Sequence, residues 1–342
     1  MIDCGATRTR VADDQGQVLA DFESVVAVNL RSGSLVAVGD TARKMSVAAA
    51  GRVELRTPFQ RGMATAVDYF AEYVELVFKQ IGLRVGGRVR LGLSVPSSLS
   101  SLEREVIGAE VGRLGTAESL LIPSVLAGAV GAGVDITQPE GSMIFQGGAS
   151  SCEVAVFSFG EMISYRSRPV GGRELVERVM RYFSESCGLV ISSETASEIV
   201  VSLVDLSPER RNRRADVWGR DSRSGEVRQV RVEEDAFYHL ALPPVDAMVD
   251  LVPEVLSVCQ AELVADIAER GVTLIGGLAL LAGLSARLAS SAQVKVMVPA
   301  DPDLVVLRGL TEILRHAGHA TYDGILEQQG RGRGLSDASL RP

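Results

Sequence analysis

The sequence predicts a duplicated, two-lobed α/β fold, because three glycine-containing turns follow one another in a fixed order. Residues 1–11 and 143–154 each contain a short apolar strand, a turn of small residues and a returning strand. Residues 273–284 join a strand to a helix through Gly276 and Gly277. Small residues in such turns leave backbone N–H groups open to an anion such as a phosphate. One Gly-Gly turn is common, but three turns in this order indicate a nucleotide-binding fold.

Length and composition agree with a globular protein of this kind. The chain has 342 residues, enough for two domains, and 46% of them are hydrophobic. Its net charge of −8 argues against nucleic acid as a partner. No apolar run approaches the roughly 20 residues that span a bilayer, and no secretory signal precedes the first strand. The four cysteines lack metal-site spacing, so we expect reduced thiols in a soluble cytoplasmic protein.

Hydrophobic periodicity predicts the elements between the turns. Strands are expected at 25–29, 35–38, 89–95, 120–122, 216–220 and 226–232. Helices are expected at 68–81, 124–133, 175–187, 195–204, 253–270 and 304–317. Ser100 or Ser101 can cap a further helix, with Glu103 in its first turn. The apolar stripe of 68–81 favours core packing over a face that lies on a membrane.

Three other segments have polar or charged character. Residues 209–214 hold four arginines, which indicates a solvated loop or, alternatively, a site for an anionic surface or partner. His316 and His319 have the spacing of metal ligands, but no third ligand is near them in sequence. Residues after about 323 are rich in Gly, Gln, Arg and Ser, which predicts a disordered tail.

The three turns and several other segments resemble the bacterial actins, specifically the MreB and Mbl cell-shape proteins, from residue 1 to about 317. The similar segments outside the turns are 24–28, 37–39, 95–104, 127–133, 153–159, 170–172 and 270–284. The resemblance implies a bilobal actin-like fold, in which two duplicated ribonuclease-H-like domains, each with a smaller subdomain, surround a central cleft. It places lobe I at 1–135 plus 303–320 (small subdomain about 29–60), lobe II at 136–302 (small subdomain about 181–255), and a disordered tail at 321–342.

The same resemblance implies a cytoskeletal role in cell-shape or cell-wall morphogenesis, spore-wall formation included. The protein would form or join membrane-associated filaments at the inner face of the cytoplasmic membrane. Its expected partners are itself or an MreB paralogue, proteins of cell-wall synthesis and membrane morphogenesis, and the inner membrane surface, but no nucleic acid. Some relatives attach through an N-terminal amphipathic helix; here we expect a surface loop or an anchored partner instead, because the first strand begins at once.

The resemblance also implies a cofactor, ATP with Mg²⁺, if the site still functions. The phosphates would lie against both hairpins, at Asp3, Gly5, Ala6, Thr7, Arg8, Thr9, Gly148, Ala149, Ser150 and Ser151. The adenosine would lie between two further segments, at Ser193, Glu194, Thr195, Ala196, Gly276, Gly277, Leu278 and Ala279.

Two departures from the family pattern concern the acids. Gln146 stands where the family has the aspartate that helps to hold the metal, and an amide is a poorer ligand for Mg²⁺. Asp3 is then the remaining acid that could bind a metal. Ser124 stands where a glutamate positions the attacking water. Serine is no general base without a partner histidine, so a helix N-cap is the simpler interpretation of Ser124.

Other departures lie around the expected nucleotide. Arg8 replaces an asparagine and could contact a phosphate or fill its space. Ala149 and Ser150 replace glycines of the second turn. Leu278 replaces a glycine and could point into the adenine slot. The remaining changes are Ser193 and Val200, in place of a Glu and a Lys, and Arg173 in place of an aspartate.

Together these changes lead to the hypothesis of an actin fold with weak or absent ATP hydrolysis, and with weak ATP binding or no cofactor at all. Two alternatives stay open. A conventional filament ATPase would use substituted ligands, because backbone N–H groups tolerate side-chain change. A non-polymerising regulator of wall synthesis would bind a partner instead, for example through residues 209–214.

Overall fold

The computed structural model describes residues 1–60, 63–64, 69–209 and 212–316. The chain divides into two compact units. Unit 1 consists of Met1–Gln138, Ser158–Met162 and Leu304–Pro342, and unit 2 of Pro139–Phe157 and Ile163–Asp303. The predicted tail, His319 and two of the four arginines of 209–214 lie outside the described residues.

Unit 1 is built on a five-stranded sheet in the order β10-β9-β1-β2-β3. Its strands are β1 (Ile2–Cys4), β2 (Arg8–Ala12), β3 (Val18–Glu23), β9 (Arg90–Val95) and β10 (Glu118–Pro123). Strands β1 and β2 form the predicted antiparallel hairpin, with Asp3 opposite Arg10. Strand β9 runs parallel to both β1 and β10. The first glycine turn therefore lies in the middle of the sheet.

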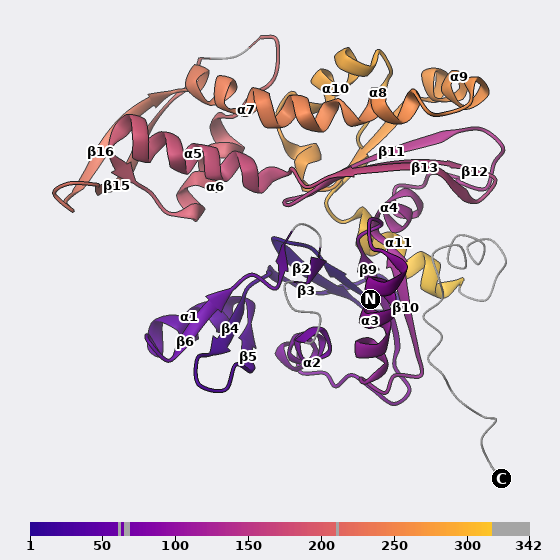
Figure 1. Ribbon diagram of the computed structural model, residues 1–342, viewed down its shortest axis with the longest axis horizontal. Coiled ribbons are helices and arrows are strands. Elements are labelled where there is room, and N and C mark those ends of the chain that lie inside the picture. The colour runs from indigo at the N-terminus through magenta and orange to yellow at the C-terminus, as the bar shows by residue number, and fades with distance from the viewer. Residues whose placement is uncertain (61–62, 65–68, 210–211, 317–342) are drawn as a thin grey trace. The chain divides into compact units, whose positions relative to one another are not determined.

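A second, smaller sheet of unit 1 has the order β5-β4-β6 and lies beside the five-stranded sheet (Figure 1). Its strands are β4 (Val26–Asn29), β5 (Leu35–Val38) and β6 (Val53–Arg56), and helix α1 (Gly39–Ala48) packs against all three. Strands β7 (Phe59–Gln60) and β8 (Met63–Ala64) form a separate pair.

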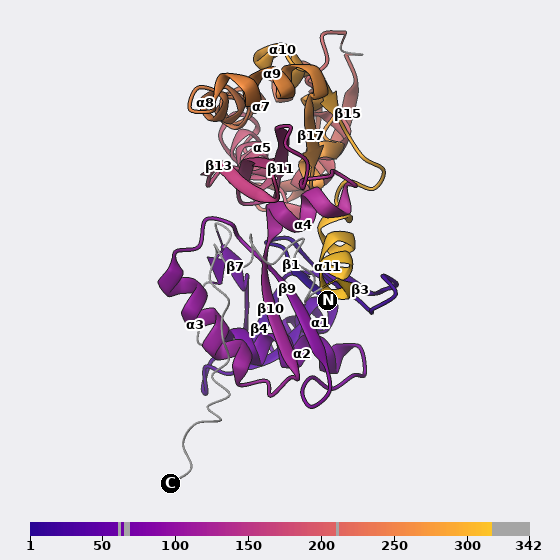
Figure 2. The same cartoon turned by 90° about the vertical axis from the view of Figure 1, so that its right-hand side faces the viewer.

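The other α-helices described in unit 1 belong with the five-stranded sheet. They are α2 (Phe70–Gln80), α3 (Ser101–Gly112), α4 (Ser124–Gly131) and α11 (Val305–Arg315). Helices α3 and α11 lie on the two sides of strands β9 and β10 (Figure 2). The capping prediction is confirmed, because Ser100 and Glu103 form a reciprocal capping box at the start of α3. The apolar stripe of α2 is buried, as core packing requires.

Helices α4 and α11 approach each other backbone to backbone. A Cβ atom on Gly309 would lie 1.7 Å from the carbonyl oxygen of Ala127, and one on Gly131 would lie 1.8 Å from that of Val305. No side chain fits at such distances. The small residues of 124–133 therefore serve a close helix–helix crossing.

Unit 2 repeats the plan of unit 1. Its main sheet has the order β13-β12-β11-β17-β18, and the antiparallel β11–β12 hairpin lies beside the parallel strand β17. The strands are β11 (Ser142–Gly147), β12 (Cys152–Ser158), β13 (Glu161–Arg168), β17 (Val272–Ile275) and β18 (Val296–Met297). The hairpin followed by a parallel strand occurs in both units in the same order, which is the duplication that the glycine turns predict.

Unit 2 also contains a smaller sheet and seven helical segments within its described residues. The smaller sheet joins β14 (Leu189–Val190), β15 (Arg214–Asp221) and β16 (Val227–Glu233). Helices α5 and α7 run side by side towards it (Figure 1). The helices are α5 (Gly172–Cys187), α6 (Ser193–Leu203), α7 (Glu234–Val249), α8 (Leu251–Leu256), α9 (Ala261–Arg270), the 3-10 helix η2 (Gly277–Leu280) and α10 (Leu284–Ala292).

Unit 2 differs from the prediction in several places, among them the short strands β14 and β18, which were not predicted. The single helix expected at 253–270 is two helices, α8 and α9, with a break after residue 256. Strand β13 was not predicted. Helix α7 continues through Pro243 and Pro244, which sequence rules assign to helix ends. Within the described ranges, no helix is long and apolar enough to cross a membrane.

The α4–α11 crossing gives a first testable prediction. The Gly309→Ala substitution should lower the free energy of unfolding by about 3 kcal/mol, the upper end of the usual cost of overpacking. Urea denaturation followed by circular dichroism measures this change. Gly112→Ala at the end of α3 is the matched control, because a Cβ there meets nothing within 4 Å. Equal stability of the two variants would contradict the close crossing.

Candidate functional site

The first glycine turn connects β1 to β2 in unit 1. A Cβ atom on Gly5 would lie 2.7 Å from the carbonyl oxygen of Arg8, so the turn requires glycine there. The hydroxyl of Ser24 donates a hydrogen bond to the carbonyl oxygen of Gly5 at 2.6 Å. A side chain from the segment after β3 thus stabilises the turn through this hydrogen bond.

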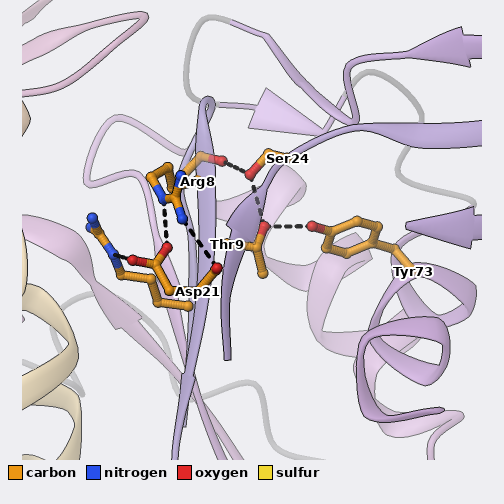
Figure 3. A network of polar contacts seen from close by, with 7 residues as sticks. Arg8, Thr9, Asp21, Ser24 and Tyr73 are labelled. Carbon is orange, nitrogen blue, oxygen red and sulfur yellow. Dashed lines mark hydrogen bonds and ion pairs between the residues drawn. The ribbon is translucent and has the colours of Figure 1, made fainter. Parts of the chain in front are cut away.

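A buried hydroxyl network extends from this contact into the core (Figure 3). The Thr9 hydroxyl lies 2.8 Å from the Ser24 hydroxyl and 2.5 Å from the Tyr73 hydroxyl. All three side chains are buried. Burial raises the pKa of Tyr73, so its phenol stays neutral and able to donate. The network ties helix α2 to the first turn.

The opposite face of β2 carries charge (Figure 3). Arg8 Nε lies 2.5 Å from Asp21 Oδ1, and Arg8 Nη2 donates to the backbone oxygen of Asp21 at 3.0 Å. Arg10 Nε lies 3.2 Å from Asp21 Oδ2. Desolvation raises the pKa of Asp21, but the two guanidinium groups outweigh it and the pKa is lowered. Two cations therefore share one carboxylate beside the turn.

Asp3, the acid of the first hairpin, accepts a hydrogen bond within unit 1. The Ser94 hydroxyl donates to Asp3 Oδ1 at 2.6 Å and accepts from the backbone N–H of Cys4 at 3.1 Å. Burial raises the pKa of Asp3, and the same cause raises the pKa of the Cys4 thiol. The carboxylate thus has a hydroxyl donor from β9 as well as Arg10 opposite it across the hairpin.

The second glycine turn, in unit 2, presents two polar atoms that have no partner. The N–H of Gly148 bonds to the carbonyl oxygen of Ser151 at 2.9 Å and closes the turn. Gln146 Oε1 and Ser150 Oγ are buried without a hydrogen-bond partner in the described part of the chain. Unpaired buried polar atoms are costly, so they indicate a position for a hydrogen-bonding ligand or for water.

Glycines pack the second turn against its neighbours in unit 2. The N–H groups of Gly172 and Arg173, at the start of α5, donate to the carbonyl oxygens of Gly148 and Ala149 at 3.1 and 2.8 Å. A Cβ on Gly171 would lie 2.5 Å from the Gly148 oxygen. These contacts join the hairpin to the start of α5.

The third turn closes on the same hairpin. Gly276 has a φ of +86°, and a Cβ there would lie 2.3 Å from the carbonyl oxygen of Gly147. Leu278 is only 7% exposed and belongs to the hydrophobic core of unit 2. A Cβ on Gly147 would lie 2.7 Å from that of Leu278. Leu278 therefore packs against the hairpin, within the core of the unit.

The predicted adenosine segment forms the start of α6. Ser192 caps this helix by accepting from the N–H of Thr195 at 3.1 Å, and Ala196 is buried. After α6, the N–H of Leu206 bonds to the carbonyl oxygen of Ala282 at 2.9 Å. Unit 2 thus brings together the second turn, the start of α5 and the third turn, and it connects the third turn to the chain that follows α6.

The N-cap prediction for Ser124 is wrong. Pro123 is the N-cap residue of α4, with ψ of 130° and no side-chain cap, and Ser124 is the first helical residue. The reason is local: Pro123 is the last residue of β10 and its ψ is extended, so the helix begins only at Ser124. The two described histidines are engaged elsewhere, His239 with Asp235 at 3.6 Å and His316 with the carbonyl oxygen of Glu312 at 2.9 Å.

The described arginines of 209–214 form ion pairs inside unit 2. Arg213 lies 2.9 Å from Glu234 and 3.4 Å from Asp205, and Arg214 lies 2.9 Å from Glu233. The hydrogen bond from Arg213 lowers the pKa of Glu234. A cavity of about 490 Å³ beside them is lined by Pro208, Glu209, Asn212, Glu233, Glu234 and Asp235. Among the described residues, this lining is mainly acidic, and the interpretation of 209–214 as an anion site stays a prediction.

Each hairpin contains one acidic side chain, Asp3 in unit 1 and Glu153 in unit 2. Mg²⁺ takes hard oxygen ligands, usually one or two carboxylates. Across the described ranges, no three His, Cys, Asp or Glu side chains are placed to hold a metal ion. The unpaired oxygen at the second turn belongs to a neutral amide. The turns fit a phosphate-bearing ligand, and the buried side chain of Glu153 lies directly across the second hairpin from Gln146.

The duplicated sheets with a glycine-turned hairpin in each define an actin-like protein. Among solved structures, MreB5 of Spiroplasma citri bound to AMPPNP matches with a TM-score of 0.84 at 22% identity, over 95% of this chain and 98% of that one. A MamK double helical filament matches with a TM-score of 0.74 at 16% identity, over 92% and 97% of the two chains. These similarities establish the fold.

The sequence identifies the family within that fold. The model of the family described as MreB/Mbl protein matches residues 1–321. The cell shape-determining protein Mbl of Bacillus subtilis is 27% identical over 88% of this chain and 91% of its own. The cell shape-determining protein MreB of Escherichia coli is 30% identical over 90% of each. The chain belongs to the MreB/Mbl family of actin-like cytoskeletal, cell shape-determining proteins.

Sequence reasoning missed Asp21, Ser94 and Tyr73, the side chains that support the first turn. Asp21 lies directly opposite Arg10 in the β2–β3 register, so the alternation of the two strands could have indicated the pair. Tyr73 was expected only as part of an apolar stripe. Nothing in the helical pattern reveals that its hydroxyl reaches Thr9.

The hydroxyl network gives a second prediction. Tyr73→Phe removes one buried hydroxyl partner of Thr9 and should lower the free energy of unfolding by about 1–2 kcal/mol, a typical cost for a lost buried hydrogen bond. Tyr69→Phe is the matched control, because Tyr69 is 40% exposed. Urea denaturation of both variants measures the difference, and an equal, negligible effect would contradict the importance of the network.

Proposed function

We propose that this protein is a nucleotide-binding, filament-forming cell-shape protein with little or no ATP hydrolysis. The phosphate-binding segments would be Gly5–Thr9 of the first hairpin and Gly148–Ser151 of the second, as the family resemblance implies. The observation that carries the proposal is the second hairpin, which keeps the backbone turn while Gln146 supplies no acid. Binding and hydrolysis have different requirements, and the proposal is that this chain retains binding and loses hydrolysis.

Binding is supported by the shape of the turns and by their unpaired polar atoms. Gly5 and Gly148 allow the chain to turn tightly, and turns of this kind present backbone N–H groups to phosphates. The hydroxyl of Ser150 can donate to an anionic oxygen. The relative MreB5 of the same fold was solved with AMPPNP, an ATP analogue, which makes ATP the natural candidate.

Hydrolysis lacks a group that could activate water. Ser124 occupies the position expected of the catalytic acid, at the first turn of α4. Of the described histidines, His239 pairs with Asp235 and His316 with Glu312. A positioned general base typically contributes about 10²–10⁴-fold to a rate. Without it, bound ATP would persist for long times.

Assembly follows from the family and fold. MamK, of the same fold, forms a double helical filament, and we propose that this chain assembles with itself or with an MreB paralogue. The filament would lie at the inner face of the cytoplasmic membrane, attached directly or through a partner, and act with proteins of cell-wall synthesis. A role in the spore wall is included in this proposal.

The test is ATP binding and phosphate release by the same purified sample. We expect saturable ATP binding but no phosphate release above the protein-free background. The double variant Ser124→Glu, Gln146→Asp should raise phosphate release about 100-fold over the wild type, because a general base returns. Sedimentation with and without ATP measures assembly in parallel.

Rapid phosphate release by the wild type would show a conventional filament ATPase and contradict the proposal. Protein that binds ATP but stays monomeric at every concentration, alone and with an MreB paralogue, would instead favour the non-polymerising regulator.

A further inference from the structure

We propose that the outer face of the small β14-β15-β16 sheet is a membrane-binding surface that takes an anionic lipid bilayer. The surface consists of Val190, Trp218, Arg220 and Val227, with Arg223 in the adjacent turn. All of these residues belong to unit 2. The inference rests on the membrane location within the proposed function and names the surface that would provide it.

The two faces of this sheet differ in burial. The outer residues Val190, Trp218 and Val227 are 53%, 60% and 67% exposed. Side chains alternate between the two faces of a strand, so the neighbouring positions point the other way, into the hydrophobic core of unit 2. The inner residues are at most 5% exposed, and they are Leu189, Val217 and Val232. The core therefore accounts for the inner face and leaves the apolar outer face uncovered.

The strand register brings the outer residues together. Arg220 on β15 lies opposite Val190 on β14 and opposite Val227 on β16. Trp218 is two positions before Arg220 on the same strand, so its side chain lies on the same face beside this row. Opposite side chains on paired strands are about 5 Å apart, and diagonal neighbours are within reach of an aromatic ring. The indole, the two valines and the stem of Arg220 thus form one continuous patch.

Two cations at this patch have no acidic partner among the described residues. Arg220 Nη1 donates to the carbonyl oxygen of Gly225 at 3.2 Å, which holds its guanidinium near the turn without neutralising it. Arg223 is exposed in that turn, and its backbone N–H is bonded to Asp221 Oδ1 at 2.9 Å. The two guanidinium groups remain available to an anionic surface.

The acids near the patch are mostly occupied by other arginines. Asp221 pairs with Arg228 at 2.7 Å, and Asp216 pairs with Arg231 at 2.7 Å. Glu226 is the exposed acid of the turn. Residues 214–233 contain five arginines and four acids, whereas the whole chain has a net charge of −8. The hairpin is therefore locally positive on an acidic protein, which complements a negatively charged surface.

The combination of residues favours a bilayer over a protein groove. Tryptophan is enriched at the level of lipid headgroups, because its ring is apolar and its N–H is polar. Arginine lays its aliphatic stem along apolar surface and keeps its charge at the headgroups. The patch lies on an open sheet face, on a hairpin at one end of unit 2 (Figure 1), where a broad surface can reach it.

The experiment uses the fluorescence of Trp218, which is the only tryptophan of the chain and reports on this surface alone. Full-length protein is titrated with phosphatidylcholine vesicles, with and without phosphatidylglycerol. Anionic vesicles should shift the emission to the blue, because the indole leaves water, and brominated acyl chains should quench it. Neutral vesicles should have a much smaller effect. Added salt should weaken the binding, because it screens exposed charges.

Variants test the two parts of the surface by vesicle flotation. Trp218→Ser should weaken binding to anionic vesicles about 10- to 100-fold, the range for losing one large buried apolar side chain. Trp218→Phe should retain most of the binding. The double variant Arg220→Gln, Arg223→Gln should weaken binding about 10- to 30-fold on anionic vesicles and leave neutral vesicles unaffected.

Phe159→Ser is the matched control. Phe159 is 72% exposed at the turn between β12 and β13, so the substitution removes an exposed aromatic ring outside the patch and should leave vesicle binding unchanged. Thermal denaturation of each variant confirms that it is folded before flotation.

The outcomes separate this surface from the proposed function. Vesicle binding without a blue shift, and equally strong for Trp218→Ser, would overturn this surface and leave membrane attachment elsewhere on the protein. No vesicle binding by wild type would overturn direct attachment, while ATP binding and assembly of the same sample without lipid test the proposed function independently. A blue shift that appears without vesicles as protein concentration or ATP is raised would show that a second copy covers Trp218, and would overturn the membrane assignment.

Discussion

Backbone-to-backbone contact through glycine is the constraint on which both units depend. In unit 2, Gly147, Gly171 and Gly276 let three segments meet at the hairpin, at distances where a Cβ atom would lie within 2.7 Å of a neighbouring atom. In unit 1, Gly131 and Gly309 do the same for helices α4 and α11. The position of the hairpin in unit 2 is therefore set by main-chain packing, which is insensitive to the side chains that face a ligand.

This separation explains how the chemistry of a site can change while its fold persists. Gln146 and Ser150 lie on a turn whose shape is fixed by its glycines and by the start of α5, so their identity is free to change. In unit 1 the hydroxyl network of Thr9 stabilises the first turn from the core side. Arg8, the residue that replaces the family's asparagine, lies on the opposite face of β2. A retained actin fold with altered polar groups is the expected result of such an arrangement.

The sequence was sufficient wherever local rules dominate. The two hairpins, the capping box at Ser100 and the apolar stripe of α2 follow from turn chemistry, capping and periodicity. It was insufficient where tertiary packing overrides those rules. Helix α7 continues through Pro243 and Pro244, and the hydroxyl of Tyr73 contacts a residue 64 positions away. The roles of the individual site residues stay predictions, because they depend on the ligand.

The central claim is that this protein binds ATP and hydrolyses it little or not at all. The most direct measurement is the crystal structure of the protein grown with ATP. The account predicts an intact triphosphate in the electron density. A structure that contains ADP, or one without any nucleotide, would contradict it.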